Sequence, residues 1–262
     1  MDDILLRTDE NAVTTLTLNR PKAINALSEE MLTALQNELD SIAKDRSIRV
    51  IVLKGAGKAF CAGHDLKQMT AARQAEDAGK AYFNALFKQC GVLMTTITKQ
   101  PQPVIAQVHG IATAAGCQLV ASCDLAIAAE GTRFGVNGIN IGLFCSTPMV
   151  ALSRNIPRKQ AFEMLTTGDF IESARAAELG LINRAVPHDA LEAETNALAE
   201  KLASKLGVAV KIGKKSFYKQ LEMGLEDAYA FTGEAMAENM LFRDTERGVA
   251  AFLDKRTPEW DQ

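Results

Sequence analysis

Hydrophobic and polar positions follow two different periods in the first part of the chain. Residues 13–18 (VTTLTL) alternate between apolar and polar side chains, a pattern that predicts a short strand. Further on, Leu32, Leu35, Leu39 and Ile42 recur at helical spacing after Ser28, which is a favoured helix-capping residue. We therefore expect a strand followed by a capped amphipathic helix.

Four more strands are expected along the chain. They are RVIVL (49–53), PVIAQV (103–108), LAIAA (125–129) and INRAV (182–186), the last of which ends before Pro187. A continuous apolar run such as 49–53 is typical of a strand that is buried on both faces, as in a parallel sheet. A short apolar helix is expected over 114–122, and a polar, alanine-rich helix that is solvated or mobile over 71–90. Strands that alternate with helices predict the α/β fold class.

The pattern changes near residue 190 to helical signals only. They cover residues 189–206, 208–221, 225–242 and 245–255. We expect two parts, a spiral α/β core over 1–189 and a helical C-terminal subdomain over 190–262. The subdomain is rich in apolar side chains for its length, so it is expected to close over the core or to pack on neighbouring subunits.

Composition narrows the function classes. The 262 residues include 29 basic and 32 acidic side chains, a net charge of −3, which does not favour nucleic-acid binding. No apolar run approaches the roughly 18 residues of a membrane span, so no membrane partner is expected. The five cysteines form no C-x-x-C pair and the first residues contain no apolar signal segment. These features led to the expectation of a cytoplasmic protein with reduced thiols.

Several common chemistries lack their motifs. The string G55-A-G-K58 has neither the glycine spacing of a dinucleotide loop nor that of a P-loop. The sequence contains no H-E-x-x-H and no G-x-S-x-G string, and its three histidines are too far apart to ligate a metal from one helix. No metal site is therefore predicted.

Two segments do suggest a chemistry, because each puts small residues directly after a buried strand. In the segment that follows the strand at 49–53, Ala62-Gly63 permits a tight turn that exposes the N–H of His64. In the segment that follows the strand at 103–108, Ala114-Ala115-Gly116 opens a helix, whose first N–H groups are free. Two such donors aimed at one point would stabilise a negatively charged oxygen. On the residues alone, close packing between strand and helix is the alternative explanation.

The sequence resembles the crotonase superfamily, the enoyl-CoA hydratase/isomerase group. The resemblance rests on N19–L27, A59–K67, P103–D124, T166–D169 with A176–I182, and A251–R256. Within the superfamily, A114–D124 and G142–P148 most resemble the branch of enoyl-CoA hydratase domain-containing proteins. The similarity spans nearly the whole chain, with its motifs in the family's order.

The resemblance implies a spiral of β-β-α turns, C-terminal helices that form trimers commonly paired into hexamers, and an acyl-CoA thioester as ligand. It places the oxyanion hole at the backbone N–H groups of His64 and Ala115. It also implies a set of substrate-binding residues, of which the last two would come from a neighbouring subunit. They are Lys22, Ala23, Ile24, Ala62, Asp65, Leu66, Lys67, Phe252 and Lys255. CoA is part of the substrate, so no separate cofactor is expected.

The chain departs from the family at the two glutamates that the hydratases use. The matching positions hold Gln118 and Gly138. Glutamine has no proton to exchange near neutral pH, and glycine has no side chain, so efficient ordinary hydration is not expected. Isomerisation, decarboxylation and thioester hydrolysis stay open. The alternative is a catalytically silent acyl-CoA-binding or assembly protein. Other residues that could exchange protons here are the side chains of His64 and Asp65.

Overall fold

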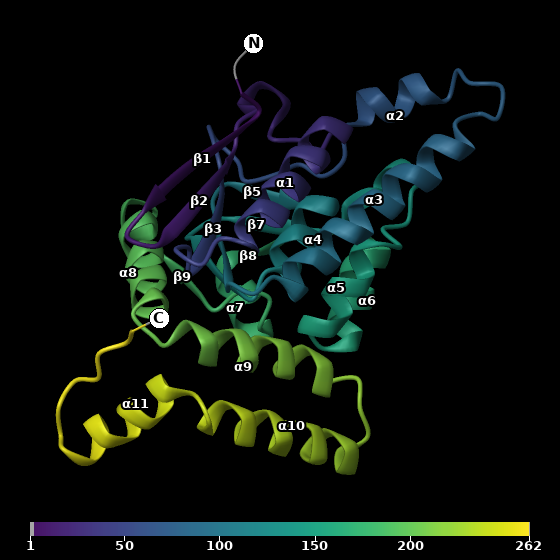
Figure 1. Cartoon of the computed structure of the whole chain (residues 1–262). Coiled ribbons are helices and arrows are strands. Elements are labelled where there is room, and N and C mark those ends of the chain that lie inside the picture. Colours follow the sequence, from purple (N-terminus) through teal and green to yellow (C-terminus); the bar gives the residue numbers. More distant parts are fainter. Residues whose placement is uncertain (1–2, 262) are drawn as a thin grey trace.

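A computed structural model describes residues 3–261 and contains two β-sheets (Figure 1). The larger sheet has six strands in the order β1-β2-β3-β4-β6-β9. Its strands are β1 (Leu5–Glu10), β2 (Val13–Leu18), β3 (Val50–Gly55), β4 (Val104–Val108), β6 (Leu125–Ala129) and β9 (Arg184–Val186). Only β1 runs antiparallel to its neighbour, and the other pairs are parallel. The strands predicted from the apolar runs are all present within three residues of their expected bounds.

The smaller sheet contains β5 (Ile111–Thr113), β7 (Arg133–Gly135) and β8 (Ile171–Glu172). Successive turns of the chain follow one plan: a strand of the larger sheet, a short strand of the smaller sheet, then one or two helices. Strand β4 leads through β5 to α4 (Ala115–Ser122), and β6 leads through β7 to α5 (Pro148–Asn155) and α6 (Arg158–Thr167). These β-β-α turns are the spiral that the sequence resemblance implies.

The predicted capped helix is α1 (Glu29–Ile42). The hydroxyl of Ser28 accepts a hydrogen bond from the N–H of Met31 at 3.3 Å, as expected of an N-cap residue. The predicted stripe of Leu32, Leu35, Leu39 and Ile42 is buried against the sheet. This prediction is confirmed.

The helix expected over 71–90 is wrong in its bounds and in its environment. The chain instead forms α2 (Leu66–Ala72) and α3 (Lys80–Lys99), separated by a turn in which Ala78 and Gly79 have positive φ angles of 54° and 84°. The alanines spread through this segment made the break hard to predict, because alanine favours helix formation on either side of it. Helix α3 is not solvated all round: Leu86, Cys90 and Leu93 are buried in the main core.

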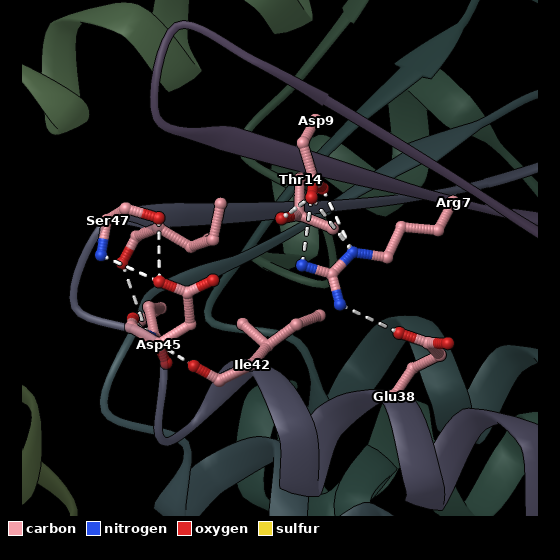
Figure 2. A network of polar contacts seen from close by, with 9 residues as sticks. Arg7, Asp9, Thr14, Glu38, Ile42, Asp45 and Ser47 are labelled. Atoms are coloured by element: carbon pink, nitrogen blue, oxygen red, sulfur yellow. Dashed lines mark hydrogen bonds and ion pairs between the residues drawn. The ribbon is translucent and has the colours of Figure 1, made fainter.

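Strand β1 is absent from the sequence prediction because its residues are mostly exposed and polar. It is held by a polar network that links the β1–β2 hairpin to α1 (Figure 2). The guanidinium of Arg7 bonds the carboxylate of Asp9 at 2.9 Å and that of Glu38 on α1 at 3.1 Å. The Thr14 hydroxyl donates to Asp9 at 2.8 Å, and the Arg7 guanidinium beside Asp9 lowers the pKa of that carboxyl.

The C-terminal part contains α7 (Ser173–Leu179), which precedes β9, and then four helices. These are α8 (Leu191–Ala203), α9 (Gly207–Gln220), α10 (Leu225–Met240) and α11 (Arg243–Leu253). Helix α8 packs on the larger sheet, where Ala199 meets Val50, Val52 and Ile105. Helices α10 and α11 lie beyond α9, on the side away from the sheets (Figure 1). The four predicted helices are confirmed, and the division at residue 190 stays a prediction.

A buried ion pair links α9 to the core. The ammonium of Lys214 bonds the Asp124 carboxylate at 2.6 Å and the carbonyl oxygens of Ile97 and Gln102 at 2.9 and 3.0 Å. The hydroxyl of Tyr218 donates to the other oxygen of Asp124 at 2.9 Å. Burial raises the pKa of Asp124 and lowers that of Lys214, and their mutual attraction opposes both shifts. None of the described helices is both long and apolar enough to cross a membrane.

Candidate active site

Two loops that the sequence placed in the substrate site lie side by side. The N–H of Ala62 donates to the carbonyl of Ile24 at 3.0 Å, and the N–H of Leu27 donates to the carbonyl of Gly63 at 2.8 Å. A third bond runs from the N–H of Asp65 to the carbonyl of Leu27 at 3.2 Å. The structure therefore brings the loop that carries Lys22, Ala23 and Ile24 against the loop 61–65.

Asn25 fixes the geometry of this corner, and the sequence analysis missed it. Its side-chain amide donates to the carbonyls of Ala56 and Ala59, both at 2.8 Å, and its oxygen accepts from the N–H of Arg20 at 2.9 Å. The residue is fully buried and has a φ angle of 53°, a conformation that asparagine tolerates better than most residues. An asparagine two residues after a Pro-containing turn was the available signal.

The second candidate segment meets the first where α4 begins. A Cβ placed on Gly63 would lie 3.0 Å from the carbonyl oxygen of Thr113 and 3.2 Å from the nitrogen of Ala115. A Cβ placed on Gly116 would lie only 2.3 Å from the carbonyl oxygen of Cys61. The two backbones are thus in direct contact, and both glycines are required by this close approach.

The N–H groups of His64 and Ala115 are both without a hydrogen-bond partner among residues 3–261. The bonds on either side of His64 use the carbonyl of Gly63 and the N–H of Asp65, and leave its own N–H unused. Ala115 is the first residue of α4, which has no side-chain cap. Before it, Ala114 has φ 49° and ψ −119°, a strained conformation for a residue with a Cβ. Such strain is often found at functional sites, and here it sets the direction of the first helical N–H.

A third element reaches the start of α4 from the smaller sheet. The N–H of Ala114 donates to the carbonyl of Gly135 at 2.9 Å, and the hydroxyl of Thr113 donates to the Asn137 side-chain oxygen at 2.5 Å. Asn137 begins the 3-10 helix η2 (Asn137–Ile141), which contains Gly138. Gln118 lies one turn into α4 and is buried, and its oxygen contacts the sulfur of Cys90 at 3.9 Å.

The surroundings of Gly138 leave no open space for a side chain. A Cβ there would lie 2.3 Å from the carbonyl oxygen of Leu143 and 2.9 Å from the sulfur of Cys145. We therefore expect Gly138→Ala to lower the free energy of unfolding by about 1–3 kcal/mol, because the backbone must shift to admit one methyl group. Urea unfolding would measure this change, with Gly213→Ala as the control, since a Cβ at Gly213 meets nothing within 4 Å. Equal stability of Gly138→Ala and the parent would contradict the crowding.

Some residues of the predicted CoA-binding set are bonded within the protein, and others are exposed. The Asp65 carboxylate is engaged within the protein: it pairs with Arg20 at 3.0 Å and caps α2 by accepting from the N–H of Lys67 at 3.0 Å. Leu66 and the side chains of Lys22 and Lys67 are exposed. Lys22 therefore supplies positive charge on the loop before α1 and Lys67 supplies it in the first turn of α2, while Asp65 caps the helix that carries Lys67.

Phe252 and Lys255 do not join the other site residues within one chain. Phe252 is near the end of α11 and is 81% exposed, and Lys255 follows the helix with a φ angle of 55°. Helix α11 and helix α2 stand at opposite ends of the molecule (Figure 1). The prediction that these two residues serve a neighbouring subunit's site stays a prediction.

The thiols around the site are shielded. Burial raises the pKa of Cys61 and of Cys90 to about 12, so both are neutral thiols near pH 7. Among the described residues, no group of three or more His, Cys, Asp or Glu side chains is placed to hold a metal ion.

The spiral of β-β-α turns, followed by the C-terminal helices, defines a crotonase-fold protein. A family model described as enoyl-CoA hydratase/isomerase matches residues 8–262, and the chain belongs to this family. A crystal structure of an enoyl-CoA hydratase of Mycobacterium smegmatis superposes with a TM-score of 0.95 at 53% identity, covering 100% of both chains.

The predicted branch is confirmed by two further relatives. The crystal structure of human enoyl coenzyme A hydratase domain-containing protein 3 superposes with a TM-score of 0.94 at 43% identity, covering 98% of this chain and 100% of that one. The protein of the same name from Xenopus laevis is 45% identical over 96% of this chain and 84% of its own length.

The expectation of a cytoplasmic protein is contradicted by these relatives. The Xenopus protein is named as mitochondrial, as are its rat, human, mouse and zebrafish counterparts. The thiol pattern on which the expectation was based does not distinguish the cytoplasm from an organelle.

Proposed function

We propose that this protein is an enzyme of acyl-CoA metabolism that binds an acyl-CoA thioester and stabilises its enolate in an oxyanion hole. The two donors are the N–H groups of His64 and Ala115. The observation that supports the proposal is the close approach of Gly63, the residue before His64, to Ala115, the first residue of α4, since the N–H groups of His64 and Ala115 are both without a partner among the described residues. Backbone donors fixed in this way need no reorganisation when charge develops on the thioester oxygen.

Recognition of the CoA moiety is proposed to depend on local charge, because the chain as a whole carries a net charge of −3. Lys22, on the loop before α1, and Lys67, in the first turn of α2, are exposed and would attract the phosphates. Ala23, Ile24, Ala62 and Leu66 would line the same groove. Phe252 and Lys255 would be contributed by a neighbouring copy.

Association into trimers or hexamers is part of this proposal. Large apolar side chains on the C-terminal helices are exposed in the single chain, including Leu225, Tyr229, Met236, Leu241 and Leu253. Exposed apolar surface of this extent is typical of subunit contacts.

Ordinary hydration is expected to be slow, because neither Gln118 nor Gly138 can exchange a proton with water or with the α-carbon. We expect Gln118→Glu to raise crotonyl-CoA hydration at least about tenfold, since a positioned acid–base group contributes 10²–10⁴-fold in enzymes generally. Loss of crotonyl-CoA absorbance measures the rate. Glutamine and glutamate have nearly the same shape, so the change alters chemistry rather than packing.

The control is Gln107→Glu, which places the same substitution on β4. No gain from Gln118→Glu would mean that water cannot be positioned beside α4. Failure of the parent protein to bind butyryl-CoA in calorimetry would reject the proposed function altogether. Binding without any turnover or α-proton exchange would favour the alternative, a catalytically silent acyl-CoA-binding protein.

A further inference from the structure

The backbone of His64 is fixed on both sides. The carbonyl of Gly63 and the N–H of Asp65 both bond to Leu27, at 2.8 and 3.2 Å. The imidazole therefore leaves the loop in a defined direction, toward α3. There its ring meets the ring of Phe87 edge-on, with the centroids 5.6 Å apart and the planes at 63°.

Both ring nitrogens of His64 are buried, and neither has a partner at hydrogen-bonding distance and angle among the described residues, although the carbonyl of Leu27 lies near enough to raise the pKa of the ring. Buried polar atoms in native proteins are nearly always paired, so an unpaired donor and acceptor on one ring call for an explanation. Close packing accounts for the position of the ring, but it does not account for a histidine here, because an apolar residue would pack against Phe87 without two unsatisfied nitrogens. A bound ligand or a water molecule would satisfy them.

Among the described residues of the candidate site, the imidazole of His64 is the group best suited to proton exchange near neutral pH. Phe87 of helix α3, which meets the ring, is apolar. Further along α3, Cys90 is a neutral thiol that contacts the amide of Gln118 on α4. The neighbouring carboxylate, Asp65, is engaged by Arg20 and by the N–H of Lys67. Tyr82 lies on the same helix as Phe87, and burial raises its pKa.

Burial also sets the charge state of the imidazole. Desolvation lowers the pKa of His64, and the nearby carbonyl of Leu27 offsets this only in part. The ring is therefore neutral at pH 7, and a neutral imidazole is able to accept a proton.

Resting on the proposed enolate chemistry, we infer that the imidazole of His64 is the base that removes the α-proton of the bound thioester. The α C–H bond breaks, its electron pair forms the enolate, and the proton goes to a ring nitrogen. The enolate oxygen accepts hydrogen bonds from the N–H groups of His64 and Ala115. The imidazolium then returns the proton to the α-carbon, or to the γ-carbon of an unsaturated acyl chain. The reaction class is proton transfer on the acyl group, and it needs no activated water.

The test is α-deuteration of butyryl-CoA in D₂O, followed by mass spectrometry, in the parent protein and in His64→Gln. The substitution keeps the backbone N–H, so calorimetric binding of butyryl-CoA should stay within about threefold of the parent. Exchange should fall at least about 100-fold, the low end of what a general base contributes. The control is His188→Gln, since His188 is exposed on another part of the molecule and should exchange as the parent does.

The pH profile gives a readout that a structural role would not produce. The base form of the imidazole is lost as the pH falls through its pKa, which lies below the ordinary value of about 6.5. The exchange rate of the parent should therefore be constant around pH 7–8 and should decline only at a pH lower than that at which an ordinary imidazole becomes protonated. The residual rate of His64→Gln should lack this decline.

Each contrary outcome has a separate meaning. Exchange by His64→Gln at the parental rate, with the parental pH profile, overturns the inference. Loss of thioester binding together with exchange also overturns it, because the residue would then hold the loop rather than move the proton. Binding by the parent without exchange overturns it and leaves thioester binding intact. A parent that neither binds nor exchanges rejects the proposed function itself.

Discussion

Lys214→Met is expected to lower the free energy of unfolding by about 3–5 kcal/mol, the usual result of removing one partner from a buried ion pair. The substitution leaves the Asp124 carboxylate buried with its charge uncompensated. It also leaves the carbonyls of Ile97 and Gln102 without the ammonium that now bonds them. Urea denaturation followed by circular dichroism would measure the loss.

The control for this prediction is Lys215→Met, because Lys215 is the next residue of α9 and is exposed. That substitution should change stability by less than about 0.5 kcal/mol. Combining Lys214→Met with Asp124→Asn should recover part of the loss, since no unpaired charge then remains. If Lys214→Met is as stable as Lys215→Met, the ion pair between Lys214 and Asp124 does not stabilise the packing of α9 on the core.

Gly116→Ala is expected to slow enolate formation about 100-fold or more, measured as α-deuteration of butyryl-CoA, because oxyanion-hole donors contribute about 10²–10³-fold. The added methyl group would lie 2.3 Å from the carbonyl oxygen of Cys61, and neither backbone is able to yield cheaply. Helix α4 must then move away from the loop 61–65. The N–H of Ala115 moves with it, and a displacement near 1 Å is enough to disrupt such a geometry.

Gly213→Ala serves as the matched control, since it makes the same change in a helix with open space around the new atom. Circular dichroism should show that Gly116→Ala remains folded, so that the loss is assigned to the site. A folded Gly116→Ala variant with the parental exchange rate would show that the two N–H groups do not act together.

The buried strands and the C-terminal helices were predictable because their signals are local. A continuous apolar run such as 103–108 has few alternatives to a buried strand, and the stripe from Leu32 to Ile42 has the helical period with its cap in place. The break at 73–79 was not predictable in the same way. Alanine-rich segments keep their helical propensity through it, whereas the structure has a turn in which Ala78 takes a positive φ angle and the Asp77 carboxylate accepts from the N–H groups of Gly79 and Ala81.

The candidate site was predictable only in part, because several of its contacts join residues that are far apart in the sequence. His64 and Ala115 were predicted as donors because small residues follow each buried strand, and their role stays a prediction. The role of Asn25 depends on carbonyls more than 30 residues away, which no local pattern shows. The pairing of Asp65 with Arg20 spans 45 residues in the same way. The sequence could not show that the ring nitrogens of His64 are buried without a partner among the described residues, because this depends on the packing of α3 against the ring.

The crowding at Gly138 makes the two positions of the family's glutamates unequal. A glutamate placed at 138 by a single substitution would push a side chain into the carbonyl of Leu143 and the sulfur of Cys145. The segment 138–145 would have to repack before it could carry a carboxylate, whereas Gln118→Glu needs no such rearrangement. A two-carboxylate site in this chain therefore requires changes in several residues of that segment and not at position 138 alone.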